Sequence, residues 1–347
     1  MTHATAEPAA APDATAATPH LLDVRDLHVE FHTAEGLSKV INGVSYHLDP
    51  GETLAVLGES GSGKSVTAQA IMGILDTPPA VIRSGQILYQ GRDLLTISEE
   101  ARRQVRGKEI AMIFQDALSA LNPVFPVGWQ IAETLRVREG LSRADARRRA
   151  VELMELVKIP AARERISDYP HQFSGGMRQR VMIAMSLAMK PRVLIADEPT
   201  TALDVTVQAQ IMDLLADLRR ELNMGMILIT HDLGVVADVA DRIAVMYAGR
   251  IIEHADVRSL YKSPAHPYTK GLLESIPRMD VRGQKLATIK GLPPNLMDIP
   301  AGCPFHPRCP YAQQVCREVV PPEIPVGAPG RYSACHFAKE VHDGRLG

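Results

Sequence analysis

The stretch Gly58-Glu59-Ser60-Gly61-Ser62-Gly63-Lys64-Ser65 follows the pattern G-x-x-x-x-G-K-S. Before it lies a short apolar run, Thr53–Leu57, of the kind that forms a buried parallel strand. After it, residues 66–75 show a helical pattern that ends before Pro78 and Pro79. A strand, a glycine-rich loop and a helix in this order predict a phosphate-binding loop. The alternative, a flexible glycine–serine loop, leaves the flanking strand and helix unexplained.

This loop has the groups that a triphosphate requires. Its glycines let backbone N–H groups turn inward around an anion, and the start of the following helix adds partial positive charge. We expect Lys64 to reach the β- and γ-phosphates and Ser65 to offer its hydroxyl to Mg²⁺. The residues predicted to hold the nucleotide here are Gly58, Ser60, Gly61, Ser62, Gly63, Lys64, Ser65 and Val66.

Length and composition restrict the class of protein. The chain has 347 residues, enough for more than one domain. A net charge of −2 and an aromatic content of 4% give no case for nucleic acid as a partner. The longest apolar stretch, residues 181–189, is too short to span a bilayer. Residues 1–20 are rich in Ala, Thr and Pro and lack the features of a signal peptide, so we expect a disordered tail and a cytoplasmic protein.

Three later apolar runs, each typical of a buried strand, end in polar residues: Gln115, the pair Asp197-Glu198, and His231. Polar groups at the carboxyl ends of parallel strands lie at the edge where such sheets bind ligands. We expect Gln115 and Asp197 to meet Mg²⁺ directly or through water, Glu198 to polarise the attacking water, and His231 to contact the γ-phosphate. A surface glutamine, a solvated acidic pair and a structural histidine are the alternatives.

A second anion cradle is predicted at Ser174, Gly175 and Gly176, which begin another helical pattern. The chain has only one phosphate loop, so the second cradle suggests a nucleotide held by another subunit. The cradle lies in a mostly helical region, residues 117–190. Asp204 ends a tight loop that follows the Asp197-Glu198 strand, and we include it among the nucleotide-binding candidates.

The outer parts of the chain show different patterns. Residues 22–31 and 40–48 alternate like strands and predict an antiparallel β layer against the nucleotide-binding sheet. Phe31 from this layer is the candidate to stack on adenine, with a plain core aromatic as the alternative. The predicted domains are a nucleotide-binding domain over residues 21–255, with its helical subdomain at about 117–190, and an extension over residues 256–347, where prolines become frequent.

Together these motifs resemble those of the ATP-binding subunits of ABC transporters, over residues 21–256. The resemblance implies an α/β fold: a RecA-like P-loop NTPase core, an antiparallel β subdomain and a helical subdomain, plus an irregular C-terminal extension. It also implies that two cassettes dimerise head to tail and that each ATP meets the phosphate loop of one and the Ser-Gly-Gly of the other. The sequence departs from many relatives at Met177, where they carry Gln.

A narrower resemblance covers the end of the chain. Residues 263–269, 291–294 and 303–310 are similar to the C-terminal extension of oligopeptide and dipeptide importer ATPases. This implies Mg²⁺-dependent ATP hydrolysis that powers uptake of di- or oligopeptides, with nickel or another small solute as the alternative. The implied partners are a second, homologous cassette, two transmembrane permease subunits and an extracytoplasmic solute-binding protein. The implied location is the cytoplasmic face of the inner membrane, without a nucleic-acid partner.

Two other classes explain the sequence less well. A soluble ABC ATPase acting on ribosomes or in DNA repair would usually carry two cassettes or a long coiled coil. This chain has one phosphate loop and no heptad run. A small-molecule kinase with a phosphate loop would leave the second cradle at Ser174 unexplained.

All four cysteines lie in one proline-rich segment: Cys303, Cys309, Cys316 and Cys335. Thiols grouped with so little apolar periodicity suggest a metal centre that replaces a core. None of these pairs has the close spacing of a zinc knuckle. Zinc and free structural thiols remain alternatives, and the resemblance to dipeptide-importer ATPases implies a four-iron, four-sulfur cluster.

Overall fold

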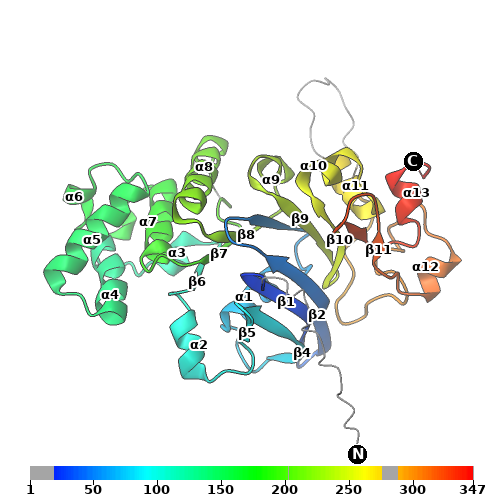
Figure 1. Ribbon diagram of the computed structural model, residues 1–347, viewed down its shortest axis with the longest axis horizontal. Coiled ribbons are helices and arrows are strands. Elements are labelled where there is room, and N and C mark those ends of the chain that lie inside the picture. The colour runs from blue at the N-terminus through cyan, green and yellow to red at the C-terminus, as the bar shows by residue number, and fades with distance from the viewer. Residues whose placement is uncertain (1–18, 202, 276–287, 347) are drawn as a thin grey trace, which may run out of the picture.

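The structure, a computed structural model, describes residues 19–201, 203–275 and 288–346. Most of the predicted tail therefore lies outside the described residues. The described residues form two sheets (Figure 1). The smaller sheet is antiparallel and has the order β2-β1-β4-β5. Its strands are β1 (Leu22–Thr33), β2 (Gly36–Leu48), β4 (Ala80–Tyr89) and β5 (Arg92–Asp93).

The larger sheet has the order β11-β12-β10-β9-β3-β8-β7-β6. Strand β3 (Thr53–Leu57) lies within it, parallel to both neighbours, β8 and β9. The remaining strands are β6 (Ile110–Ile113), β7 (Val193–Asp197), β8 (Gly225–Thr230), β9 (Arg242–Tyr247), β10 (Arg250–Asp256), β11 (Ile324–Pro325) and β12 (Tyr332–Ser333). All five residues of β3 are buried, as its continuous apolar run predicts.

Both faces of β3 are covered because successive side chains of a strand point to opposite faces. Leu54 and Val56 pack with the small sheet and α1 (Lys64–Met72). Ala55 and Leu57 pack with α9 (Leu233–Val239) and with the C-terminal extension. The loop that follows β3 is therefore anchored in a fully packed strand, with the small sheet on one side and the extension on the other.

Helices between β6 and β7 gather at one end of the molecule, away from the extension (Figure 1). They pack around a core that includes Ile131, Leu153 and Ile183. These helices are α3 (Ala117–Ala120), α4 (Val127–Glu139), α5 (Arg143–Leu156), α6 (Ala162–Arg165) and α7 (Gly175–Leu187), with a 3₁₀ turn at Pro170–Gln172. Elsewhere lie α2 (Glu99–Val105) and the amphipathic α8 (Val205–Leu222).

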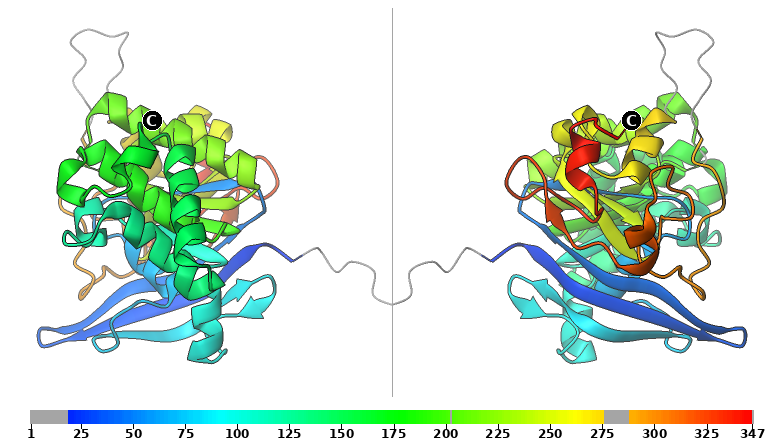
Figure 2. Two further views of the ribbon diagram at one scale, coloured as in Figure 1. Left: turned by 90° about the vertical axis from the view of Figure 1, so that its left-hand side faces the viewer. Right: turned by 90° about the vertical axis from the view of Figure 1, so that its right-hand side faces the viewer.

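Short elements make up the C-terminal extension, at the opposite end from α4 to α7 (Figures 1 and 2). They are the helices α10 (Val257–Lys262), α11 (Pro267–Glu274), α12 (Gln314–Glu318) and α13 (Ala338–His342), with strands β11 and β12. Strand β12 pairs with β10, Ser333 opposite Glu253, so the extension continues the main sheet. Among the described residues, no helix combines the length and apolar character needed to cross a membrane.

Candidate nucleotide site

The chain leaves β3 through a loop that only glycine can form at two points. Gly58 has φ of 157°, and a Cβ there would lie 2.3 Å from the carbonyl oxygen of Met246. Gly63 caps α1 with φ of 104° in the left-handed region, and a Cβ there would lie 2.7 Å from Ile41. The loop therefore turns tightly against β9 and β2 and leads directly into the first turn of α1.

Lys64 points back into this loop. Its side chain is buried, and Nζ donates to the carbonyl oxygens of Gly58 at 2.8 Å and Glu59 at 3.0 Å. Burial lowers the pKa of Lys64, and the acidic side chains of Glu198 and Asp197 oppose that shift. The buried Ser62 hydroxyl has no hydrogen-bond partner within the described chain. A bound phosphate would give the Ser62 hydroxyl a partner and Lys64 an anionic one, so the loop fits a nucleotide.

Ser65 and Asp197 meet at the carboxyl end of the sheet. The Ser65 hydroxyl donates to Oδ1 of Asp197 at 3.0 Å. Asp197 is buried, which raises its pKa; the neighbouring charge of Glu198 acts in the same direction, and the Ser65 hydrogen bond opposes it. A hydroxyl beside a carboxylate supplies the oxygen ligands that Mg²⁺ prefers, so these residues fit the expected metal ion.

Glu198 is the centre of a hydrogen-bond cluster next to Asp197. Its carboxylate accepts from Gln115 Nε2 at 2.8 Å and from Thr201 Oγ1 at 2.9 Å, and it lies 3.4 Å from Nδ1 of His231. The backbone of Glu198 has a φ of 46°, and its N–H donates to the carbonyl oxygen of Ile229 at 2.8 Å. A non-glycine residue in this region is uncommon and often marks a functional position.

The sequence did not predict that Thr201 would hydrogen-bond to Glu198. Its only signal is a hydroxyl three residues after Glu198. By contrast, the structure does bring Gln115, Asp197, Glu198 and His231 together, because each lies at or just after the carboxyl end of a parallel strand of the same sheet.

The second cradle forms a separate, exposed surface. Ser174 caps α7 and accepts from the backbone of Met177. A Cβ on Gly176 would lie 2.5 Å from Val207 at the start of α8, so that position requires glycine. Asp204 caps α8 by accepting from the Val207 N–H at 2.9 Å. Ser174, Gly175, Gly176 and Asp204 therefore lie around the adjoining starts of two helices.

Two further candidates lie in or against the small sheet. Phe31, on β1, is opposite Ser38 of β2 and Ala80 of β4 and is half-buried against the adjacent core. Its stacking on adenine remains a prediction. Val66 in α1 is also half-buried against that core.

Comparisons with known proteins agree with this geometry. Residues 41–201 match the family model described as ABC transporter. Residues 252–316 match the model for the C-terminal region of oligopeptide/dipeptide transporters. The fold resembles a dimeric ATP-binding cassette solved in a post-hydrolysis state with ADP and Pi, with TM-score 0.61 and 25% identity, over 68% of this chain and 99% of that one. The fold and the family match are those of an ABC ATPase, an enzyme that hydrolyses ATP.

Similar sequences narrow the class. The chain is 53% identical to the oligopeptide transport ATP-binding protein OppD of Bacillus subtilis, over 92% of this chain and 88% of that protein. It is 50% identical to OppD of Salmonella typhimurium, over 91% of this chain and 93% of that one. The chain belongs to the oligopeptide/dipeptide family of ABC transporter ATP-binding proteins. The kinase alternative is therefore set aside.

The predicted iron–sulfur cluster is contradicted by these comparisons. The matching families and relatives are described by ATP binding and peptide transport, and nothing in them supports a cluster. The inference failed because the segment has a core. Cys303 and Cys316 are buried in one cluster with Tyr247, Tyr268 and Phe305, and the two tyrosines lie outside the cysteine-bearing residues 303–335.

The cysteines are free thiols in this structure. Burial raises the pKa of Cys303 to about 11 and of Cys335 to about 12, which favours the neutral thiol. Within the described ranges, no three of the cysteine sulfurs lie within 4.8 Å of one another, so they do not form a ready single-ion zinc site.

Proposed function

We propose that this chain powers the uptake of di- and oligopeptides through an ABC importer. The observation that carries the proposal is the cluster around Glu198, next to Lys64 and Ser65, in a chain whose extension belongs to the oligopeptide/dipeptide type. The relatives named as oligopeptide transport proteins support the choice of solute. Nickel or another small solute is the alternative.

Each group has a proposed part in hydrolysis. Lys64 exchanges its loop carbonyl partners for the β- and γ-phosphates. Ser65 and Asp197, with Gln115 directly or through water, would hold Mg²⁺, which would neutralise developing charge on the phosphates. Glu198 orients and polarises the attacking water, while Gln115 and Thr201 fix its carboxylate. His231, which is largely exposed, hydrogen-bonds the γ-phosphate.

The proposed ATP dimer uses the exposed cradle. Ser174 and Gly175 are exposed at the start of α7, where a second cassette can present its own phosphate loop, and Gly176 is half-buried against Val207. The solved neighbour, described as dimeric and bound to ADP and Pi, supports such a pairing. In this proposal the partner is a homologous cassette, and ATP bound between the two subunits favours the closed dimer.

The proposed permease contact is an exposed apolar patch on the helical end. Phe125 and Trp129 stack with ring centroids 4.3 Å apart, yet both rings are more than a third exposed. Phe114 and Val124 are also exposed, and Phe114 directly precedes Gln115. Phe125 and Trp129 form an exposed pair of contacting rings, and exposed apolar surface of this kind marks interaction sites. The patch would place the chain at the cytoplasmic face of the inner membrane, below two permease subunits that receive peptide from an extracytoplasmic binding protein.

Hydrolysis by the assembled importer tests the proposal. Glu198→Gln removes the water-polarising carboxylate but preserves the shape of the side chain. We expect peptide-stimulated ATPase activity in proteoliposomes to fall at least about a hundredfold, while MgATP binding is retained. Glu221→Gln, an exposed position on α8, is the matched control and should hydrolyse normally.

The same vesicles identify the solute. Uptake of labelled di- and oligopeptides, but not Ni²⁺, is the expected result. Uptake of Ni²⁺ alone would replace the peptide assignment, and normal hydrolysis by Glu198→Gln would refute the role given to that carboxylate.

A further inference from the structure

Glu59, the second residue of the phosphate loop, contacts the C-terminal extension. Its carboxylate accepts two hydrogen bonds from the Arg308 guanidinium, from Nη1 at 2.7 Å and from Nη2 at 3.0 Å. Its backbone N–H donates to the hydroxyl of Tyr268 in α11 at 2.9 Å. A two-point guanidinium–carboxylate pair fixes orientation as well as distance. The extension therefore holds both the backbone and the side chain of one loop residue.

The third polar group of Glu59 leads to the nucleotide site. Its carbonyl oxygen accepts from Lys64 Nζ at 3.0 Å, and the charge of Glu59 also acts on the pKa of Lys64. Arg308 and Tyr268 are thus separated from the phosphate-binding lysine by a single residue. A shift of Glu59 would move the carbonyl oxygen that Lys64 contacts.

Arg308 is itself held in place. Its side chain is only 6% exposed, against 25% for Glu59. Nε donates to the carbonyl oxygen of Lys290 at 3.1 Å, and the guanidinium lies 5.8 Å from the ring centroid of Tyr247. Tyr247 and the fully buried Tyr268 pack with centroids 4.7 Å apart. The arginine is therefore oriented by groups of the chain itself.

The pair of Arg308 and Glu59 also changes the charge beside the phosphate loop. A free Glu59 carboxylate beside the loop would repel a triphosphate, and Arg308 neutralises it. Burial alone would lower the pKa of Arg308, but the hydrogen bonds to Glu59 and Tyr247 outweigh burial and raise it. The guanidinium is therefore charged near neutral pH.

We propose that Arg308 and Tyr268 are positioning residues that act through Glu59 to hold the phosphate loop in the shape that binds MgATP. The C-terminal extension thereby sets the nucleotide affinity of the cassette. The proposal rests on ATP binding and does not depend on which solute is carried. A loop that contacts the phosphates before and during hydrolysis affects both states alike, so affinity changes while turnover at saturation does not.

Binding by the full chain tests this directly, with Mg²⁺ and the non-hydrolysable analogue adenylyl imidodiphosphate in a calorimeter. Arg308→Gln should weaken binding about tenfold, since a charge-assisted two-point bond is lost. Tyr268→Phe keeps the ring in its aromatic cluster and removes only the acceptor for the Glu59 N–H, so about threefold is expected. In the assembled importer, KM for ATP should rise by the same factors and kcat should change less than about twofold.

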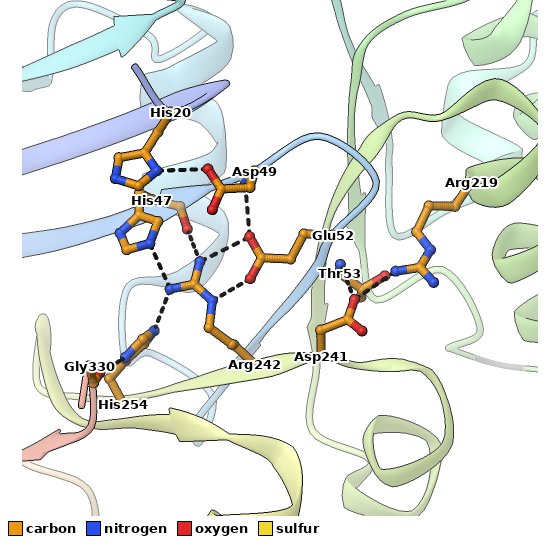
Figure 3. A network of polar contacts seen from close by, with 10 residues as sticks. All are labelled: His20, His47, Asp49, Glu52, Thr53, Arg219, Asp241, Arg242, His254 and Gly330. Atoms are coloured by element: carbon orange, nitrogen blue, oxygen red, sulfur yellow. Dashed lines mark hydrogen bonds and ion pairs between the residues drawn. The ribbon is translucent and has the colours of Figure 1, made fainter. Parts of the chain in front are cut away.

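The matched control is Arg242→Gln, which removes a guanidinium from another two-point pair, with Glu52 (Figure 3). Its affinity for the analogue should stay within about twofold of the unmodified chain. Unchanged affinity in both Arg308→Gln and Tyr268→Phe would overturn the proposal and leave the extension as packing alone. That outcome would leave the test of Glu198 untouched.

A double substitution checks that the effect passes through Glu59. If it does, Arg308→Gln should change the affinity by less than about twofold in a chain that already carries Glu59→Gln. If Arg308→Gln weakens binding in that chain as much as in the unmodified chain, Arg308 acts by another route and the proposal is wrong.

Discussion

The two ends of strand β3 carry the same kind of ion pair with different consequences. Glu52 precedes the strand and receives two hydrogen bonds from Arg242, while Glu59 follows it and receives two from Arg308. The amino-end pair joins parts of the scaffold, whereas the carboxyl-end pair lies at the phosphate loop. The chemistry of the pair is the same, so its role is decided by which end of a parallel strand it occupies.

The amino-end network is broader (Figure 3). Arg242 also lies 2.9 Å from Nε2 of His47 and 3.3 Å from Nε2 of His254, and Nδ1 of His254 lies 3.0 Å from the carbonyl oxygen of Gly330. One guanidinium thus connects β2, β9, β10 and the extension. The ring of His47 stacks on that of His20, 3.8 Å away, which adds the chain just before β1. This network holds layers together and does not contact the nucleotide residues described above.

Of the substitutions that test this comparison, removal of the Arg242 guanidinium should cause the largest loss of stability. Arg242→Gln leaves Glu52 partly buried without its cation and His47 and His254 without their shared donor. The free energy of unfolding should fall by about 3 kcal/mol, at the lower end of the range for a broken buried pair because both side chains keep some exposure. Urea denaturation measures this loss. A change below about 1 kcal/mol would show that the amino-end pair is not the stronger structural link.

Buried and half-buried histidines near both ends of β3 make the stability of the protein depend on pH. Burial lowers the pKa of His266, the N-cap of the helix that carries Tyr268, to about 3. Burial, and then Arg242, lower the pKa of His47 and His254. The unfolded chain binds these protons near pH 6.5 and the folded chain does not, so stability is full above pH 6.5 and declines as pH falls below it.

For His266 alone the decline should reach about 2 kcal/mol at pH 5. His266→Asn keeps an acceptor for the Tyr268 N–H and removes the titration. Urea unfolding at pH 7.5 and 5.0 should therefore show a smaller loss in this variant than in the unmodified chain. An equal loss in both would mean that His266 is not the group that resists protonation.

Local patterns predicted the part of the molecule that is built from neighbours in sequence. The strand Thr53–Leu57, the loop and α1 follow from one continuous stretch, and the cluster of Asp197, Glu198 and His231 follows from where parallel strands end. Contacts between residues far apart in the chain could not be predicted from the sequence. Glu59 and Arg308 are 249 positions apart, and no local pattern connects them.

The prediction of a metal centre at the cysteines was wrong for the same reason, because it also depended on contacts between residues distant in sequence. Their segment has little periodicity of its own, so a metal centre was inferred in place of a core. Tyr247 on β9 and Tyr268 in α11 supply that core from outside the segment. The pairing of β12 with β10 is likewise set by tertiary packing, since a two-residue strand leaves no pattern in the sequence.

The smallest expected effect on stability comes from the loss of an exposed ion pair. Lys158 contacts Asp217 of α8 at 3.3 Å, with side chains 61% and 39% exposed. Water screens such a pair, and Asp217 retains Arg220 as a second partner. Lys158→Gln should leave both the urea midpoint and the affinity for adenylyl imidodiphosphate unchanged within error. A clear shift in the midpoint would mean that pairing by itself, and not burial at the ends of β3, stabilises this protein, and the contrast between Arg242 and Lys158 would be lost.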